Sequence, residues 1–219
     1  MKDLLIVGNW KENETEEEVL TFLSDFSKIY EERPNVKVII CPSYLVVGEV
    51  WEFIKSNNIP IELGVQDISK FPEGAHTGEV SARQAAEFAR FTIIGHSERR
   101  ALGESDEDVK KKVEAALKNN IEPIVCVVND NVPIPYGAKI VAYEPIGAIG
   151  TGNPDTPENA ERIASTIKSN NGEVLHVLYG GSVTSENVHK FIQMQNIDGV
   201  LVGGASLDPI EFSSIINQC

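Results

Sequence analysis

The alternation of apolar runs with amphipathic segments constrains the fold of this chain more than any other feature of its sequence. The run VKVIICP (36–42) is almost continuously apolar, as in a strand that is covered on both faces. The segment 44–58 then has apolar residues at helical spacing, and the same cycle returns along the chain. Strands are predicted at 4–9, 36–42, 59–67, 91–95, 121–128, 138–145, 173–181 and 197–204.

Helices are predicted in the segments between these strands. Ser105 is a typical N-cap for one of them, and Pro157 fits the first turn of another. The exception is the segment 129–137, NDNVPIPYG, which has two prolines and no helical period. The predicted helices cover 14–32, 44–58, 81–90, 105–120, 156–170, 184–195 and 208–218, and a further helix is predicted to start at SERR, 97–100.

Alternating strands and helices indicate a parallel sheet with right-handed crossovers. Eight such units within 219 residues favour an α/β fold of the closed (β/α)8 barrel type, with one outer helix missing between the fifth and sixth strands. The hydrophobic fraction of 42% is enough for one sizeable core. The sequence has no linker or low-complexity tract, so residues 1–219 are expected to form a single domain.

The net charge of −14 limits the partners that the chain can bind. Nucleic acid and anionic membrane surfaces are not expected as partners, because 33 acidic residues outnumber 19 basic ones. A small anionic substrate remains possible, because one lysine and local backbone dipoles can outweigh the global field in a cleft. The short apolar run at the N-terminus resembles neither a signal peptide nor a membrane span.

The three cysteines, Cys41, Cys126 and Cys219, are widely spaced and odd in number. They form neither a disulfide framework nor a zinc pattern, and we therefore expect a reducing, cytoplasmic setting. Cys126 lies in the apolar run IVCVV and is interpreted as a small core residue, with a nucleophile as the alternative.

Candidate functional residues follow several of the predicted strands. In a barrel of this type, chemistry is located at the carboxyl ends of the strands. Asn9 and Lys11 follow the first strand, His96 the fourth and Glu144 the sixth, and two double-glycine turns follow the last two strands. Lys11 alone could be a solvated surface lysine, and Glu144 alone could cap a helix. Together they place a cation, an imidazole and a carboxylate at one mouth, beside turns suited to an anion.

Six motifs of the chain occur in the order found in one enzyme family. They are GNWKEN, GAHTGEVSA, IIGHSERR, AYEP followed by AIGTG, YGGSV and LVGGASL, and the chain resembles the triosephosphate isomerase family on their evidence. The resemblance implies a TIM barrel that interconverts dihydroxyacetone phosphate and D-glyceraldehyde 3-phosphate in glycolysis and gluconeogenesis. It also implies that no cofactor or metal takes part, and that the chain forms a homodimer, with a tetramer as a further possibility.

The resemblance assigns roles to five catalytic positions. Glu144 matches the base that removes a proton from carbon and gives an enediol(ate), and His96 matches the electrophile that polarises the carbonyl. Lys11 matches the cation that steadies the phosphate and the developing oxyanion. Asn9 matches the residue that positions the substrate, and Glu98 matches the carboxylate that pairs with the lysine.

The resemblance also implies a phosphate site, a lid and a subunit contact. The phosphate would be bound mainly by backbone donors of Gly150, Ser182, Gly203 and Gly204. The lid would be the segment 145–152, which begins at Pro145, and Ile149 and Leu201 would form an apolar clamp over the base. The loop tip at Thr77 would enter the neighbouring subunit.

The stretch HSE predicts how the histidine is kept uncharged. Ser97 is expected to cap the helix that begins after His96, and the helix N-terminus disfavours an imidazolium.

The chain also departs from the family pattern. Gly147 replaces the usual tryptophan of the first hinge, and Asn129 replaces the glutamate that contacts it. Two other interpretations remain: a different phosphate-handling isomerase on the same barrel, and a non-catalytic relative that acts as a scaffold.

Overall fold

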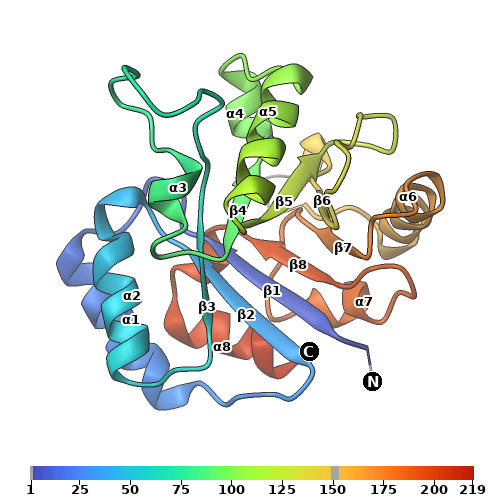
Figure 1. Cartoon of the computed structure of the whole chain (residues 1–219). Coiled ribbons are helices and arrows are strands. Elements are labelled where there is room, and N and C mark those ends of the chain that lie inside the picture. Colours follow the sequence, from blue (N-terminus) through green and yellow to red (C-terminus); the bar gives the residue numbers. More distant parts are fainter. Residues whose placement is uncertain (1, 149–152) are drawn as a thin grey trace.

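The computed structural model describes residues 2–148 and 153–219 and confirms the predicted barrel (Figure 1). All strand pairs are parallel, and β1 pairs with both β2 and β8, so the sheet closes on itself in the order of the chain. The strands are β1 (Leu4–Asn9), β2 (Val36–Cys41), β3 (Glu62–Val65), β4 (Phe91–Ile94), β5 (Glu122–Val127), β6 (Ile140–Tyr143), β7 (His176–Tyr179) and β8 (Gly199–Val202).

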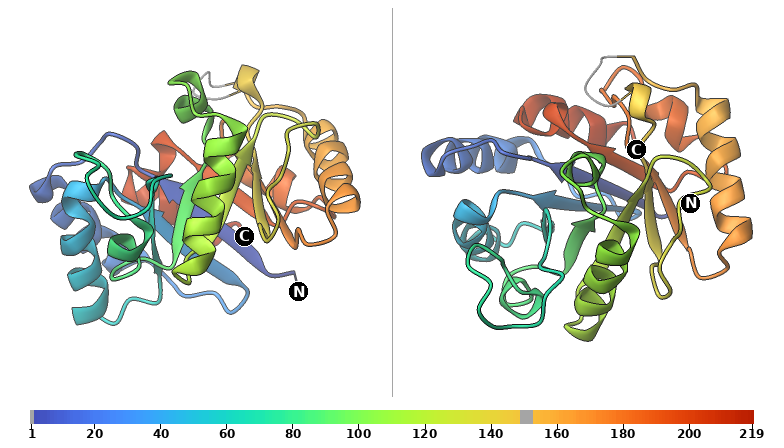
Figure 2. Two further views of the ribbon diagram at one scale, coloured as in Figure 1. Left: turned by 45° about the horizontal axis from the view of Figure 1, so that its top comes forward. Right: turned by 90° about the horizontal axis from the view of Figure 1, so that it is seen from above.

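Helices surround this barrel on its outside, as the view from above shows (Figure 2). Ser105 forms a capping box and Pro157 begins its helix, as expected, and Thr15 forms a further capping box. The α-helices are α1 (Glu16–Ile29), α2 (Val47–Ser56), α3 (Ala82–Ala85), α4 (Ser97–Ala101), α5 (Asp106–Lys118), α6 (Pro157–Asn170), α7 (Val188–Ile192) and α8 (Pro209–Asn217). Short 3-10 helices are η1 (Tyr44–Val46), η2 (Ile146–Ala148) and η3 (Gly204–Ser206).

Two of the predicted helices are shorter than the sequence suggests. The segments 81–90 and 184–195 are α-helical only at α3 and α7, each about one turn long. Turns and bends make up the rest of both segments. Apolar spacing marks the face that packs on the barrel, but it does not ensure that each turn completes an α-helical hydrogen bond.

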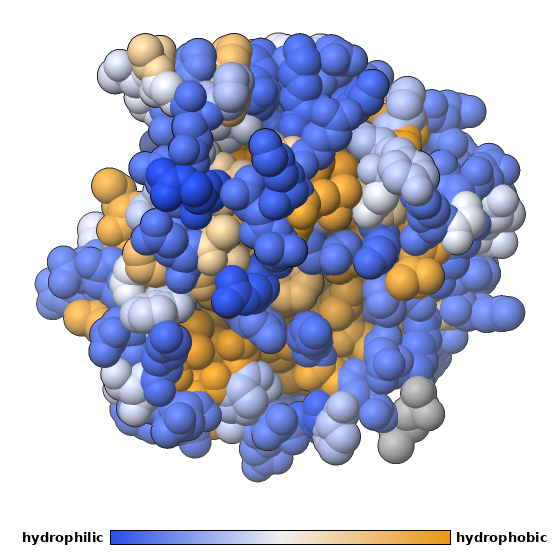
Figure 3. Space-filling view, viewed as in Figure 1, coloured by the Kyte–Doolittle hydropathy of each residue, from blue (hydrophilic) through white to orange (hydrophobic). Residues whose placement is uncertain are grey.

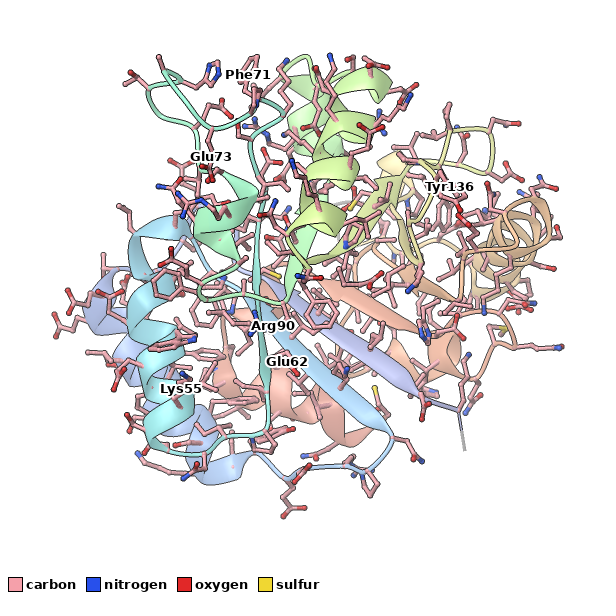
Figure 4. The ribbon with its side chains drawn as sticks, viewed as in Figure 1. Lys55, Glu62, Phe71, Glu73, Arg90 and Tyr136 are labelled. Atoms are coloured by element: carbon pink, nitrogen blue, oxygen red, sulfur yellow. The ribbon has the colours of Figure 1, made fainter. Side chains whose placement is uncertain are left out.

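The connection between β5 and β6 has no helix, as predicted from its prolines. It is a segment of turns and bends that lies between α5 and α6 in the view from above (Figure 2). Tyr136 of this segment is 86% exposed and points away from the barrel (Figure 4). The outer layer of the barrel is therefore incomplete at this place.

The core consists of two shells, one on each side of the sheet. The barrel interior is filled by inward side chains such as Val7, Ile39 and Leu178. The second shell lies between the sheet and the helices and includes the edge-to-face pair of Trp10 and Phe22. This arrangement explains why the strands are apolar on both faces.

Cys126 belongs to the inner shell, which confirms its interpretation as a core residue. Burial, followed by the neighbouring Glu144 carboxylate, raises the pKa of its thiol. A thiol in this environment is a poor nucleophile, because attack requires the thiolate.

The surface is mainly hydrophilic on the face seen in Figure 1, with apolar side chains visible between polar ones over the strands (Figure 3). Within the described parts of the chain, no helix combines the length and the apolar character needed to cross a membrane.

Candidate active site

Most of the predicted site residues line one cavity at the carboxyl ends of the strands, whereas Glu98, Pro145 and Thr77 are not part of its lining. The cavity has a volume of about 260 Å3. It is lined by Asn9, Lys11, His96, Glu144 and Leu201, and by the turns that contain Ser182, Gly203 and Gly204. Ile149 and Gly150, which were predicted for the clamp and the phosphate site, lie outside the described residues.

Glu144 and His96 form the centre of the site. Glu144 is only 1% exposed and directly follows β6, and His96 is 6% exposed and follows β4 by two residues. His96 Nε2 lies 2.9 Å from Glu144 Oε1. The backbone N–H of Ser97 donates to Glu144 Oε2 at 3.0 Å. A buried carboxylate with these neighbours is held in one orientation by polar contacts from the segment that follows β4.

The helix cap after β4 differs from the prediction. The N-cap of α4 is His96 itself, and Ser97 is the first residue of the helix. The imidazole Nδ1 accepts the backbone N–H of Glu98, the second residue of the helix, at 3.2 Å, as an N-cap side chain does. The expectation that Ser97 is the cap was therefore wrong, because the helix already includes Ser97 and the ring of His96 caps it.

The cap also defines which imidazole nitrogen carries the proton. Nδ1 accepts a hydrogen bond from Glu98, so it has no proton of its own. Nε2 then has to carry the proton, because a bare lone pair 2.9 Å from the Glu144 carboxylate would be repelled. The ring is therefore a neutral donor that points its N–H into the cavity region shared with Glu144.

Lys11 stands in a left-handed backbone conformation, with φ of 53°. Asn9 Oδ1 accepts the backbone N–H of Lys11 at 3.1 Å, and Gln66 Nε2 donates to the Lys11 carbonyl at 2.8 Å. The Lys11 ammonium bonds Glu98 Oε1 at 2.5 Å and its stem lies against Gly203. The conformation is unfavourable for a lysine by about 1–3 kcal/mol, and these bonds hold it in place.

The two double-glycine turns line the same cavity as Lys11, and Gly203 lies against the stem of that lysine. Gly203 is the N-cap of η3, and the first amides of a helix have no partner within that helix. Ser182 Oγ donates to the Ala148 carbonyl at 2.6 Å, which ties the turn after β7 to η2. Backbone donors beside a lysine suit a phosphate group.

The comparison with known proteins identifies the family. The family model described as Triosephosphate isomerase matches residues 4–133 and 135–219. The chain belongs to the triosephosphate isomerase family. Its activity is therefore the interconversion of dihydroxyacetone phosphate and D-glyceraldehyde 3-phosphate, a step of glycolysis and gluconeogenesis.

Similar proteins agree with this assignment over nearly the whole chain. The triosephosphate isomerase of Mesomycoplasma hyopneumoniae is 36% identical over 239 aligned positions, which cover 97% of this chain and 98% of that protein. The enzyme of Leifsonia xyli is 38% identical and covers 97% of this chain and 95% of its own length. The crystal structure of the Bartonella henselae enzyme superimposes with a TM-score of 0.84 at 28% identity, covering 98% of both chains.

Two positions, Asn129 and Gly147, depart from the triosephosphate isomerase pattern. Asn129 Oδ1 accepts the backbone N–H of Asn131 at 2.9 Å, so its side chain caps its own turn. A Cβ built at Gly147 would meet no atom of the described residues within 4 Å. The first hinge of this family member therefore has a glycine in place of the tryptophan, with open space among the described residues where a Cβ would stand.

Two residues of the site were missed by the sequence analysis. Gln66 follows β3 and bonds the carbonyls of Lys11 and Cys41, and its position after a strand was the available signal. Gly180 follows β7, and a Cβ there would lie 2.9 Å from Glu144 Cγ. The double-glycine turn that contains Gly180 was predicted to bind phosphate, but the proximity of Gly180 to Glu144 was not predicted.

Thr77 lies apart from this cavity. It is exposed on the long loop between β3 and α3, on which Phe71 and Glu73 project from the barrel (Figure 4). Among the described residues, no group of three histidine, cysteine, aspartate or glutamate side chains could hold a metal ion.

Proposed function

We propose that Glu144 is the base and His96 the proton donor of the isomerisation. The observation that carries the proposal is the 2.9 Å contact between Glu144 Oε1 and His96 Nε2, inside a cavity that also holds Lys11. A base and a neutral donor that already lie together can act on two adjacent atoms of a substrate placed between them.

The reaction needs only proton transfers. Glu144 takes a proton from carbon 1 of dihydroxyacetone phosphate, and the electron pair forms the double bond of an enediolate. His96 Nε2–H gives its proton to the oxygen on carbon 2, and the ring takes the proton of the hydroxyl on carbon 1. Glu144 then returns its proton to carbon 2, which gives glyceraldehyde 3-phosphate and the starting form of both side chains.

Lys11 and Asn9 stabilise the developing charge in this scheme. Lys11 supplies the positive charge that a phosphate dianion and an oxyanion require, in a chain whose net charge is −14. Glu98 pairs with the ammonium when the cavity holds no substrate. When substrate binds, its phosphate and oxyanion replace Glu98 as the negative partner of Lys11. The positive charge of the lysine is therefore paired both with and without substrate.

Two further groups of residues bind the phosphate and shield the base from water. Gly150, Ser182, Gly203 and Gly204 provide the donors for the phosphate. Pro145 directly follows the base and begins the lid, and Ile149 and Leu201 cover the carboxylate with apolar surface. Support comes from Leu201, which is buried in the cavity wall. Exclusion of water strengthens the electrostatic interactions and prevents loss of phosphate from the intermediate.

We further propose that the chain is a single domain that works as a homodimer in the cytoplasm. A second cavity of about 460 Å3 opens beside the catalytic one, and Lys11, Glu98, Tyr44 and Leu102 are among its lining residues. Exposed apolar side chains at this place fit a partner surface. The loop tip at Thr77 from a second copy would fill it, and a tetramer is the alternative assembly.

The test of the base is Glu144→Asp, which withdraws the carboxylate by one methylene. We expect kcat to fall about 100-fold with little change in KM in a coupled assay with glyceraldehyde 3-phosphate. Glu158→Gln, at an exposed glutamate of α6, serves as control and should keep full activity. A kcat near that of the unmodified enzyme in Glu144→Asp would contradict the assignment.

A second test addresses the phosphate site. Inorganic phosphate should inhibit competitively, because it can occupy the turns without the rest of the substrate. Kinetics that are unchanged at tens of millimolar phosphate would place the site elsewhere.

A further inference from the structure

Asp155 connects the ends of two neighbouring strands. Tyr143, the last residue of β6, donates its hydroxyl to Asp155 Oδ2 at 3.0 Å. The backbone N–H of Asp155 donates to the hydroxyl of Tyr179, the last residue of β7, at 2.8 Å. A single residue that precedes α6 is therefore bonded to both strands on the outer side of the barrel.

The two tyrosines directly precede the functional parts of the site. Tyr143 is followed by Glu144, and Tyr179 is followed by the turn Gly180–Ser182. The strand ends are also joined by the backbone, since the N–H of Gly180 donates to the carbonyl of Tyr143 at 2.8 Å. The Asp155 bonds thus add a second connection between the same pair of strand ends, on the outer face of the sheet.

The surroundings of the Asp155 side chain call for an acceptor with two oxygens. Oδ2 accepts from Tyr143 and from Asn159 Nδ2, the latter at 2.7 Å, and Oδ1 accepts the backbone N–H of Thr156 at 2.8 Å. All three partners are donors, and only a carboxylate can accept from all of them without presenting a donor of its own. Stacking on Phe191, with ring centroids 3.8 Å apart, fixes the Tyr179 ring at the other end of the cluster.

The tyrosines keep their protons throughout the working pH range. Burial and then the hydrogen bond to Asp155 raise the pKa of Tyr143, and burial raises the pKa of Tyr179 to about 12. Both hydroxyls therefore remain available for these hydrogen bonds at neutral pH.

We propose that Asp155 is a positioning residue that sets the distance between the base Glu144 and the phosphate turn Gly180–Ser182. The inference rests on the roles proposed above for these two parts. The substrate spans them, because its phosphate and its reacting carbons belong to one small molecule. A change in their separation affects the transition state even when each part remains intact.

The test is Asp155→Ala, which removes the side-chain bonds and keeps the backbone bond to Tyr179. We expect kcat to fall about tenfold, because a shift of a fraction of an ångström misplaces the base. The inhibition constant of inorganic phosphate should stay within about twofold, because phosphate contacts only the turn. Asp155→Asn should show a smaller loss, because its one oxygen can still accept from Tyr143.

The controls separate positioning from charge and from folding. Glu158→Gln removes one negative charge from the first turn of α6, close to Asp155 in the sequence, and should leave kcat unchanged. Tyr143→Phe should lose as much kcat as Asp155→Ala, and the double variant should lose no more than either. If Asp155→Ala does not fold, the inference is tested by Tyr143→Phe alone, for which the same loss of kcat is expected.

Three results would overturn the inference. They are a kcat within twofold of the unmodified enzyme for both Asp155→Ala and Tyr143→Phe, a phosphate inhibition constant that rises by the same factor as kcat falls, and fully additive losses in the double variant. Inactivity of the unmodified enzyme would instead contradict the proposed function.

Discussion

Gly180 provides the most direct test of how the base is held. A Cβ built on this glycine lies 2.9 Å from Glu144 Cγ, 3.2 Å from the Tyr143 carbonyl oxygen and 3.7 Å from Leu201 Cβ. Gly180→Ala would therefore place a methyl group where the stem of the catalytic carboxylate now lies. The methyl group cannot easily move away from Glu144, because the backbone of Tyr143 and the side chain of Leu201 lie on its other sides.

The size of the displacement follows from the contact distances. Non-bonded carbon atoms rest at about 3.5–4.0 Å, so the pair at 2.9 Å is at least about 0.6 Å too close. The side chain of Glu144 is the most movable neighbour, so it takes up most of this distance. Displacement of a reacting group by about 1 Å can cost a factor of about 100 in rate, or about 2.7 kcal/mol.

We expect kcat of Gly180→Ala to fall between about 30-fold and 100-fold, with a smaller change in KM. The assay is steady-state turnover of glyceraldehyde 3-phosphate, together with thermal unfolding. Crowding of the core should lower stability by about 1–3 kcal/mol. Gly172→Ala is the matched control, because a Cβ at Gly172 meets no atom of the described chain within 4 Å.

A kcat within twofold of the unmodified enzyme would refute the reasoning. It would mean that the backbone after β7 moves to accommodate the new methyl group, and that the position of Glu144 does not depend on Gly180. A loss of stability without a loss of kcat would lead to the same conclusion, because the strain would then be absorbed away from the base.

Other predictions concern the imidazole, the lysine and the thiols. Nitrogen NMR of His96 at neutral pH should show Nδ1 without a proton and Nε2 with one, and a protonated Nδ1 would contradict the cap geometry. Gln66→Leu should lower kcat/KM about tenfold, because it removes the hydrogen bond to the carbonyl of Lys11, whose backbone is left-handed. An unchanged kcat/KM would mean that the bond from Asn9 is enough to keep Lys11 in this conformation. Cys219, whose pKa burial raises to about 12, should react slowly with a disulfide reagent at pH 8, since about one thiol in ten thousand is then ionised. Cys126 should not react in the native enzyme, and rapid labelling would show that the inner shell opens.

The barrel itself could be predicted from local sequence. Runs such as 36–42 are apolar on both faces, and the intervening segments have helical spacing, with a cap at Ser105. These signals concern neighbouring residues, so the chain carries them before it folds. The helix missing between β5 and β6 was predicted for the same reason, because two prolines and the lack of a helical period act locally.

The motifs also determined which residues line the cavity. Asn9, Lys11, His96 and Glu144 each follow a strand, and the carboxyl ends of parallel strands meet at one end of a barrel. Strand order and direction are enough to bring such residues together, so no knowledge of side-chain packing was needed.

Only the tertiary structure decided how these residues are held. The proximity of Gly180 to Glu144, the support of Lys11 by Gln66 and the bonds of Asp155 to two tyrosines all join different strands or loops. The choice of His96 over Ser97 as the cap depends on one ring rotamer in a crowded site. Sequence spacing cannot fix such contacts, because they depend on distances between segments that meet only when the barrel closes.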